Sequence, residues 1–201
     1  YRSALFTNFT IGWAVLGIQS SLIPLLAAYL ATGGDASRAP EGTILASTVM
    51  AVGSLANALT QTVSGRLSDN LGRRIMIFIG LLIAGTAIST IGISSAPWML
   101  VALIVGMGAG AALITPSLQA SVADVIGSKR DGAPVLATFQ MHSDFGMILG
   151  PLLAGAVADT WGFTPAFMLC GGLLLAASLT WLPFRTPHWP RELADENYTG
   201  R

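Results

Sequence analysis

The chain has 201 residues, of which 53% are hydrophobic and 10% are charged, and its ten Lys and Arg balance ten Asp and Glu. Soluble domains carry about 25% charged residues, so this composition excludes an ordinary soluble protein and predicts an integral membrane protein. The single cysteine, Cys170, excludes an intrachain disulfide and a thiolate metal site.

Six apolar runs are long enough to cross a hydrocarbon core of about 30 Å, which takes roughly 20 helical residues. They predict an all-α membrane protein, with a six-helix bundle over residues 1–184 and a solvated tail over residues 185–201. The predicted spans are residues 4–30, 43–64, 75–95, 98–122, 133–157 and 163–184. The first run begins without the basic region and cleavage site of a signal peptide, and we expect a piece of a longer chain.

The basic residues indicate the orientation. With six spans, nine of the ten Lys and Arg fall on one side of the membrane, Lys129 and Arg130 among them, and only Arg38 falls on the other. By the positive-inside rule, the chain is predicted to be a multi-pass protein of the cell membrane with both ends in the cytoplasm.

A polar decapeptide, residues 65–74, separates the second and third spans, and its spacing Gly-x-x-x-Asp-x-x-Gly recurs in residues 155–162. Each copy follows the second helix of a three-helix group and precedes the third. Because an odd number of spans inverts the second group, the echo predicts two inverted three-helix repeats, as in many secondary transporters. The second copy lacks basic residues, as expected for the outer side.

Several residues of the decapeptide have a structural or electrostatic role. Gly65 and Gly72 permit close helix approach and a tight turn. Asp69 can accept hydrogen bonds at the N-terminus of the next helix. The remaining charged side chains can pair with Asp69, another part of the protein or anionic lipid. They are Arg66, Arg73 and Arg74. The plain interpretation is a topology anchor and turn.

The decapeptide resembles the signature loop of the major facilitator superfamily, in which Gly, Leu, a small residue, Asp, a second Gly and two basic residues stand at these positions. Asn70 replaces a basic residue that is common there. The resemblance implies half of a twelve-helix fold and a cytoplasmic latch between two halves. Residues 144–159 look like the eleventh helix of drug-exporter-like members and residues 8–24 like the seventh, which implies a C-terminal half with its N-terminal half missing. Residues 146–155 are also similar to the Gly-Pro motif of the fifth helix in family antiporters.

Asp144 lies about 11 residues, or roughly 16 Å, into the fifth span and therefore near the midplane. A charge there costs at least about 2.5 kcal/mol and should face protein or a water-filled cavity. Low dielectric favours the protonated form of a carboxyl group, so Asp144 is a proton-coupling candidate. His142 is a second candidate but lies on another side of the helix. The alternative is that Asp144 joins two helices through Asn57 or Gln61.

Three carboxamides are candidate substrate contacts: Asn8 and Gln19 in the first span, and Gln140 one turn before Asp144. In the resembled family the first helix of each half lines the central cavity. The alternative is interhelical hydrogen bonding, worth about 0.6–2 kcal/mol for each bond. The fourth span has small residues at 106, 108 and 110, which predict close helix packing.

The resemblance implies a secondary active transporter of small molecules, and specifically proton-coupled efflux by alternating access. One alternative is an uptake carrier for a sugar or organic acid, although no Lys or Arg lies near the midplane to bind an acid. Another is a non-transporting half-module. No phosphate-binding loop or metal-ligand spacing is found, so we expect no enzyme, cofactor or metal, and no basic surface predicts nucleic-acid binding.

Overall fold

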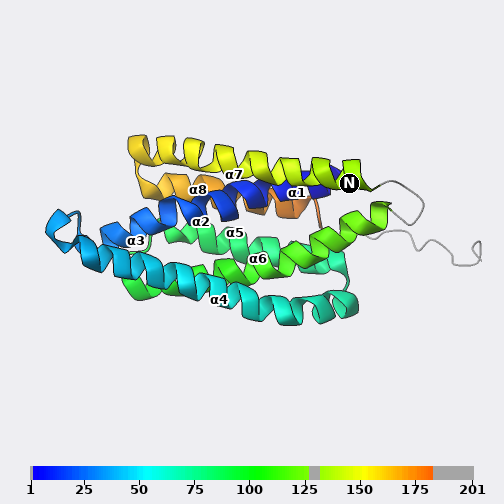
Figure 1. Ribbon diagram of the computed structural model, residues 1–201, viewed down its shortest axis with the longest axis horizontal. Coiled ribbons are helices and arrows are strands. Elements are labelled where there is room, and N and C mark those ends of the chain that lie inside the picture. The colour runs from blue at the N-terminus through cyan, green and yellow to red at the C-terminus, as the bar shows by residue number, and fades with distance from the viewer. Residues whose placement is uncertain (1, 127–131, 183–201) are drawn as a thin grey trace, which may run out of the picture.

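The computed structural model describes residues 2–126 and 132–182, and all regular elements in these ranges are helices that run side by side in an elongated bundle (Figure 1). Lys129, Arg130 and the predicted tail lie outside the described residues, as do the side chains of Asp69 and Asn70. The elements are α1 (Arg2–Ile11), the π-helix η1 (Gly12–Gly17), α2 (Ile18–Ser20), α3 (Leu22–Thr32), the 3₁₀ helix η2 (Ala36–Arg38), α4 (Ala39–Leu71), α5 (Arg73–Ile91), α6 (Pro97–Ile126), α7 (Ala133–Trp161) and α8 (Phe163–Leu179).

The elements α1, η1, α2 and α3 follow one another as one membrane-length stretch, which we name the first span. Together with α4, α5, α6 and α7 it makes five described stretches that are long and apolar enough to cross a membrane. The remaining stretch, α8, is an apolar helix of 17 residues and is about 26 Å long, at the short end of the spanning range. The prediction of an all-helical, multi-pass fold is confirmed.

The prediction that the decapeptide is a loop between two helices is wrong for residues 65–71. Helix α4 continues through Gly65 and ends at Leu71, and only Gly72 separates it from Arg73, the first residue of α5. Polar side chains mark where the chain leaves hydrocarbon, but they leave the backbone hydrogen bonds of the helix intact. A Cβ on Gly65 would meet nothing within 4 Å, so close helix approach within this chain does not explain that glycine.

Two glycines make the same kind of turn at two helix junctions. Gly72 joins α4 to α5 with φ +91°, and Gly162 joins α7 to α8 with φ +89°. Each backbone N–H donates to the carbonyl oxygen four residues earlier, at 3.0 Å for Gly72 and 2.9 Å for Gly162. This left-handed backbone favours glycine, so both halves of the sequence echo have the same turn chemistry.

Small residues bring the spans close together. The first span packs against α7, α4 packs against α6, and α5 packs against both α6 and α8. A Cβ on Gly146 of α7 would lie 2.2 Å from the carbonyl oxygen of Phe9, and one on Gly108 of α6 would lie 2.6 Å from that of Gly53 in α4. Helices in lipid associate through such close packing, because lipid removes the hydrophobic drive between them.

Helices α4 and α7 lie along opposite margins of the bundle (Figure 1). Both carry exposed apolar side chains, such as Leu59 on α4 and Ile148 on α7, while the buried side chains are concentrated in the first span, α5, α6 and α8. Lipid or another membrane-embedded protein surface can cover these apolar margins.

Candidate substrate cavity and neighbouring carboxylate

A cavity of about 430 Å³ lies between the first span, α4, α6 and α7. This volume falls within the range of about 300–1,000 Å³ that is typical of small-molecule sites. Its lining combines apolar side chains and glycines with three hydroxyls and six carboxamides, and among the described residues no charged side chain lines it. The carboxamides are Asn8, Gln19, Asn57, Gln61, Gln119 and Gln140.

All three substrate-contact candidates, Asn8, Gln19 and Gln140, line this cavity. Asn8 is 8% exposed, and its Nδ2 donates to the carbonyl oxygen of Phe139 on α7 at 2.6 Å. Asn8 therefore makes the interhelical hydrogen bond of one interpretation and also contributes to the cavity wall, while its contact with a substrate stays a prediction.

Asn57, Gln61 and Gln119 are cavity residues that the sequence did not predict. Asn57 Nδ2 donates to the carbonyl oxygen of Gly108 at 3.2 Å, and Gln61 Nε2 donates to Asn57 Oδ1 at 3.0 Å. The first bond crosses the α4–α6 interface, and the second lies within α4 and orients the Asn57 amide. Polar side chains inside apolar spans were a detectable signal, but which spans meet around a cavity is a long-range property of the fold.

Asp144 is exposed and is not among the residues that line the cavity. Gln140, one turn earlier on α7, donates from Nε2 to Asp144 Oδ1 at 3.1 Å. The predicted alternative, a bond from Asp144 to Asn57 or Gln61, is not seen among the described residues, since those amides bond elsewhere. Asp144 therefore lies beside the cavity and is linked to it by one carboxamide.

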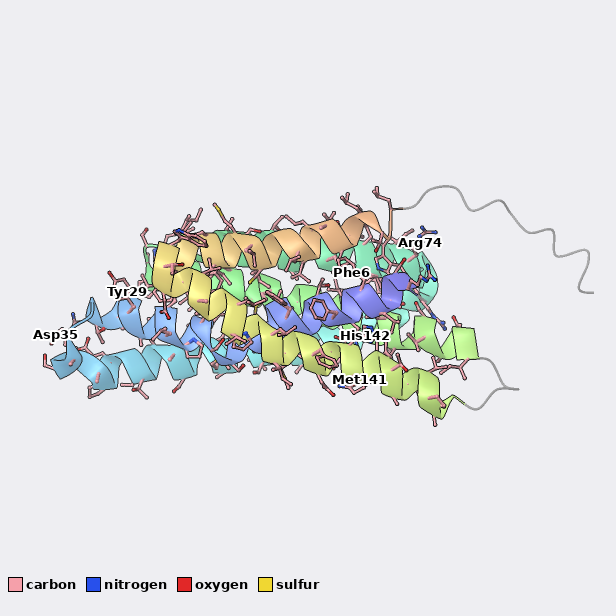
Figure 2. The ribbon with its side chains drawn as sticks, turned by 90° about the horizontal axis from the view of Figure 1, so that it is seen from above. Phe6, Tyr29, Asp35, Arg74, Met141 and His142 are labelled. Atoms are coloured by element: carbon pink, nitrogen blue, oxygen red, sulfur yellow. The ribbon has the colours of Figure 1, made fainter. Side chains whose placement is uncertain are left out.

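The ring of His142 is hydrogen-bonded to the backbone of Thr138 and not to Asp144. Its Nδ1 lies 2.7 Å from the carbonyl oxygen of Thr138, one turn earlier on α7, and donates to it, because a carbonyl oxygen can only accept. His142 is also not a cavity-lining residue, and Figure 2 labels it on α7 next to the exposed Met141. The structure thus associates Gln140, and not His142, with Asp144.

At the α4–α5 end of the bundle, Arg73 forms an ion pair with Asp124 of α6. Its Nη1 also donates to the carbonyl oxygen of Ala120 at 2.9 Å. Asp124 was not predicted, although it is an acidic residue near the end of α6 that lies at this end of the bundle. The side chains of Arg66 and Arg74 make no hydrogen bond or ion pair with another described side chain or backbone group.

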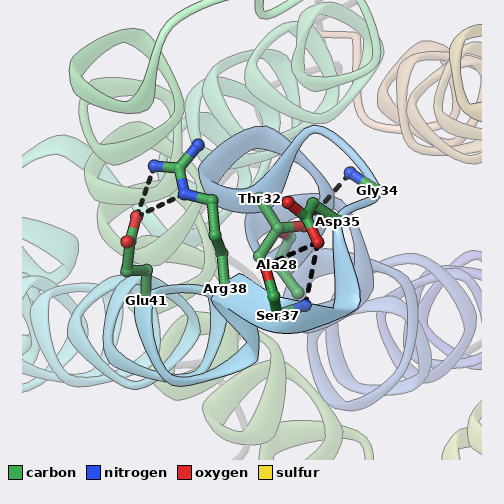
Figure 3. Close-up of polar contacts among 7 residues, drawn as sticks. All are labelled: Ala28, Thr32, Gly34, Asp35, Ser37, Arg38 and Glu41. Atoms are coloured by element: carbon green, nitrogen blue, oxygen red, sulfur yellow. Dashed lines mark hydrogen bonds and ion pairs between the residues drawn. The ribbon is translucent and has the colours of Figure 1, made fainter.

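The opposite end of the bundle holds a short capped turn, shown in Figure 3. Asp35 Oδ1 accepts from the backbone N–H of Ser37 at 2.9 Å and from its hydroxyl at 2.8 Å. These two bonds from Ser37 stabilise the carboxylate and lower the pKa of Asp35. Arg38 pairs with Glu41 nearby. Figure 2 places Asp35 and Arg74 at opposite ends of the bundle.

Comparison with known proteins decides the family. The family model described as Major Facilitator Superfamily matches residues 4–198. The chain belongs to this superfamily. The predicted resemblance is therefore confirmed, and the cavity described above is that of a major facilitator protein.

Several curated relatives are named as transporters or resistance proteins. An uncharacterised MFS-type transporter of Mycobacterium tuberculosis is 33% identical over 141 residues, which cover 68% of this chain and 24% of that protein. Multidrug resistance protein 1 of Bacillus subtilis is 28% identical, covering 91% of this chain and 44% of the relative. Multidrug resistance protein MdtG of Yersinia enterocolitica is 28% identical, covering 71% and 34%. The chain spans less than half the length of each of these relatives.

Proposed function

We propose that this chain forms one half of a secondary active transporter that exports small molecules through its amide-lined cavity. The observation that carries the proposal is the cavity of about 430 Å³ between four spans, bordered by Asp144. The relatives named as multidrug resistance proteins favour export of compounds foreign to the cell. We therefore expect the chain to lie in a lipid bilayer and to bind a small-molecule substrate.

We further propose that proton binding to Asp144 drives alternating access. Asp144 is an ionisable group inside a span, has one polar partner among the described residues, and borders the cavity. A proton that changes the charge of this group changes the relative free energies of the inward-open and outward-open states. His142 is a weaker candidate for this role, since its ring is held by Thr138.

The proposed architecture is a pair of inverted three-helix repeats. The matching turns at Gly72 and Gly162 support it, as does the pairing of the first span with α7 and of α4 with α6, which exchange under such a repeat. We assign the chain to the C-terminal half, which requires an N-terminal half to complete the cavity.

For the orientation, we propose that the α4–α5 end faces the cytoplasm, with both chain ends on that side. Arg66, Arg73 and Arg74 lie at this end, as the positive-inside rule requires. Trp98 and Trp161 belong to the opposite end and are 75% and 74% exposed, like the aromatic side chains that mark either interface of a membrane.

We propose that the decapeptide serves as the cytoplasmic latch. The ion pair between Arg73 and Asp124 ties its last turn to α6 within this half. Arg66, Arg74 and Gly65 remain for contacts with the other half, and the open space around Gly65 leaves room for a close approach by that half.

An uptake carrier is the second candidate. Six carboxamides can donate to and accept from sugar hydroxyls, so the cavity chemistry favours a sugar over an organic acid, for which this wall offers no cation. The third candidate is a half-module that assembles without transporting a substrate. Direction of flux separates the first two, and any gradient-driven flux eliminates the third.

The test is transport in vesicles that contain the complete transporter under an imposed proton gradient. Asp144→Asn should reduce gradient-driven export of a fluorescent dye at least about tenfold, since the amide cannot take up a proton. Asp159→Asn, at the exposed end of the same helix, is the matched control and should retain flux. Undiminished gradient-driven export in Asp144→Asn would refute the coupling role.

A further inference from the structure

Gln140 lines the cavity and is also hydrogen-bonded to the carboxylate of Asp144. It lines the cavity, and its Nε2 donates to Asp144 Oδ1 at 3.1 Å, whereas Asp144 itself does not line the cavity. A ligand in the cavity and a proton on Asp144 therefore act on one carboxamide. No other described side chain connects the two places.

The surroundings of Asp144 leave this hydrogen bond as its main interaction. The first span and α8 pack against α7, and the titratable groups they offer are Arg2, Tyr29 and Cys170. None of these pairs with Asp144, and Cys170 Sγ instead accepts from Trp13 Nε1 at 3.3 Å. On α7 itself, His142 is bonded to Thr138 and Asp159 lies near the far end of the helix.

A carboxamide offers an acceptor oxygen and a donor NH₂ group, whereas an ionised carboxylate only accepts. While Asp144 is ionised, Nε2 of Gln140 is used by the carboxylate, and Oε1 remains free to accept from a ligand. When Asp144 is protonated, its O–H needs an acceptor. A half-turn of the terminal amide, which is a soft and nearly two-fold torsion, brings Oε1 to that O–H and frees Nε2 for the cavity.

We propose that Gln140 is the positioning residue through which the protonation state of Asp144 selects the ligand. Ionised Asp144 makes Gln140 an acceptor for ligand N–H groups, and protonation replaces that acceptor by a donor. By linkage, an amine-bearing ligand then opposes proton binding to the same degree, as exchange of proton for ligand requires. This inference rests on the proposed proton-coupled transport. The gain or loss of one neutral hydrogen bond should change the affinity for the ligand about tenfold.

The test compares two dyes with one ring system. Proflavine carries amino N–H groups, and acridine orange carries dimethylamino groups in their place. Binding of each is measured across a pH series for the complete transporter in nanodiscs. Acidification should weaken proflavine about tenfold more than acridine orange. Gln140→Leu should abolish this difference between the dyes, whereas Gln119→Leu, in the same cavity without contact to Asp144, should preserve it.

A second measurement needs no ligand. The carboxyl C=O stretching band of protonated Asp144, identified by its loss in Asp144→Asn, should move to higher wavenumber in Gln140→Leu, because the carboxyl loses a hydrogen-bond partner. It should not move in Gln119→Leu. An unmoved band in Gln140→Leu overturns the inference, whether or not either dye binds.

The two proposals fail separately. If Asp144→Asn abolishes gradient-driven flux while Gln140→Leu changes neither the dye difference nor the carboxyl band, the role of Gln140 is wrong and proton coupling stands. If Asp144→Asn leaves that flux undiminished, the coupling proposal falls, and the inference about ligand selection falls with it, even where the carboxyl band still reports the hydrogen bond.

Discussion

Replacing Gly146 by alanine should force the first span and α7 apart. The new Cβ would lie 2.2 Å from the carbonyl oxygen of Phe9 and 2.7 Å from the backbone nitrogen of Trp13, whereas ordinary contact begins near 3.4 Å. Both obstacles are backbone atoms, so no side chain can swing away, and the helices must separate by roughly 1 Å. Overpacking of this kind costs about 1–3 kcal/mol.

Alanine also gains helix propensity over glycine, by about 1 kcal/mol, and this gain partly hides the steric cost. Gly155→Ala supplies the correction, because Gly155 lies on the same helix and its Cβ would meet nothing within 4 Å. The difference between the two variants isolates the steric term. At about 2–4 °C per kcal/mol, Gly146→Ala should melt about 2–12 °C below Gly155→Ala.

The lone cysteine provides the assay. Cys170 is fully buried in α8, so a thiol-reactive fluorophore labels it only when the bundle opens. Purified protein in detergent is heated with the fluorophore, and the midpoint of labelling is compared between the two variants. Equal midpoints would refute the close contact between Gly146 and the first span, and with it the described pairing of the first span and α7.

Two further predictions concern the ends of the bundle. Arg73→Gln should lower thermal stability by less than about 1 kcal/mol, since the pair with Asp124 is partly exposed. The charge exchange Arg73→Asp with Asp124→Arg should recover the transport that either single change loses. If it does not, the ion pair has no functional role. Asp35 has a lowered pKa, so the stabilisation from its bonds to Ser37 is present above its ordinary pKa and lost as pH falls through the lowered value. Amide hydrogen exchange at Ser37 should therefore gain protection, relative to the intrinsic rate, as pH rises through that range, whereas Asp35→Asn should show no such change; the same dependence in both proteins would exclude the carboxylate as its cause.

Hydropathy was enough to predict an all-helical, multi-pass fold, because the bilayer imposes a length and a composition on each helix independently of its neighbours. It did not predict that α4 continues to Leu71, since the polarity of residues 65–71 reports the edge of the hydrocarbon and not the end of the helix. The turn at Gly72 was predictable from the sequence, because the left-handed backbone there favours glycine.

The cavity was predictable only in part. Asn8, Gln19 and Gln140 were singled out as polar residues in apolar spans, and all three line it. The contributions of α4 and α6 depend on which spans cross near one another, which is set by long-range packing such as that of Gly108 against Gly53. The bond between Gln140 and Asp144 follows from helical spacing, but its position at the cavity edge does not.

The length of α4 has a mechanical consequence. Its 33 residues extend about 50 Å, well beyond a hydrocarbon core of about 30 Å. If the helix tilts as a rigid rod about its middle, each end is a lever arm of about 25 Å, and a rotation of about 10° carries Gly72 sideways by about 4 Å. Because α6 packs along α4 and is tied to α5 by Arg73, α6 should move together with this end of α4. Any protein or lipid surface that contacts this end of the bundle is then displaced by a similar distance.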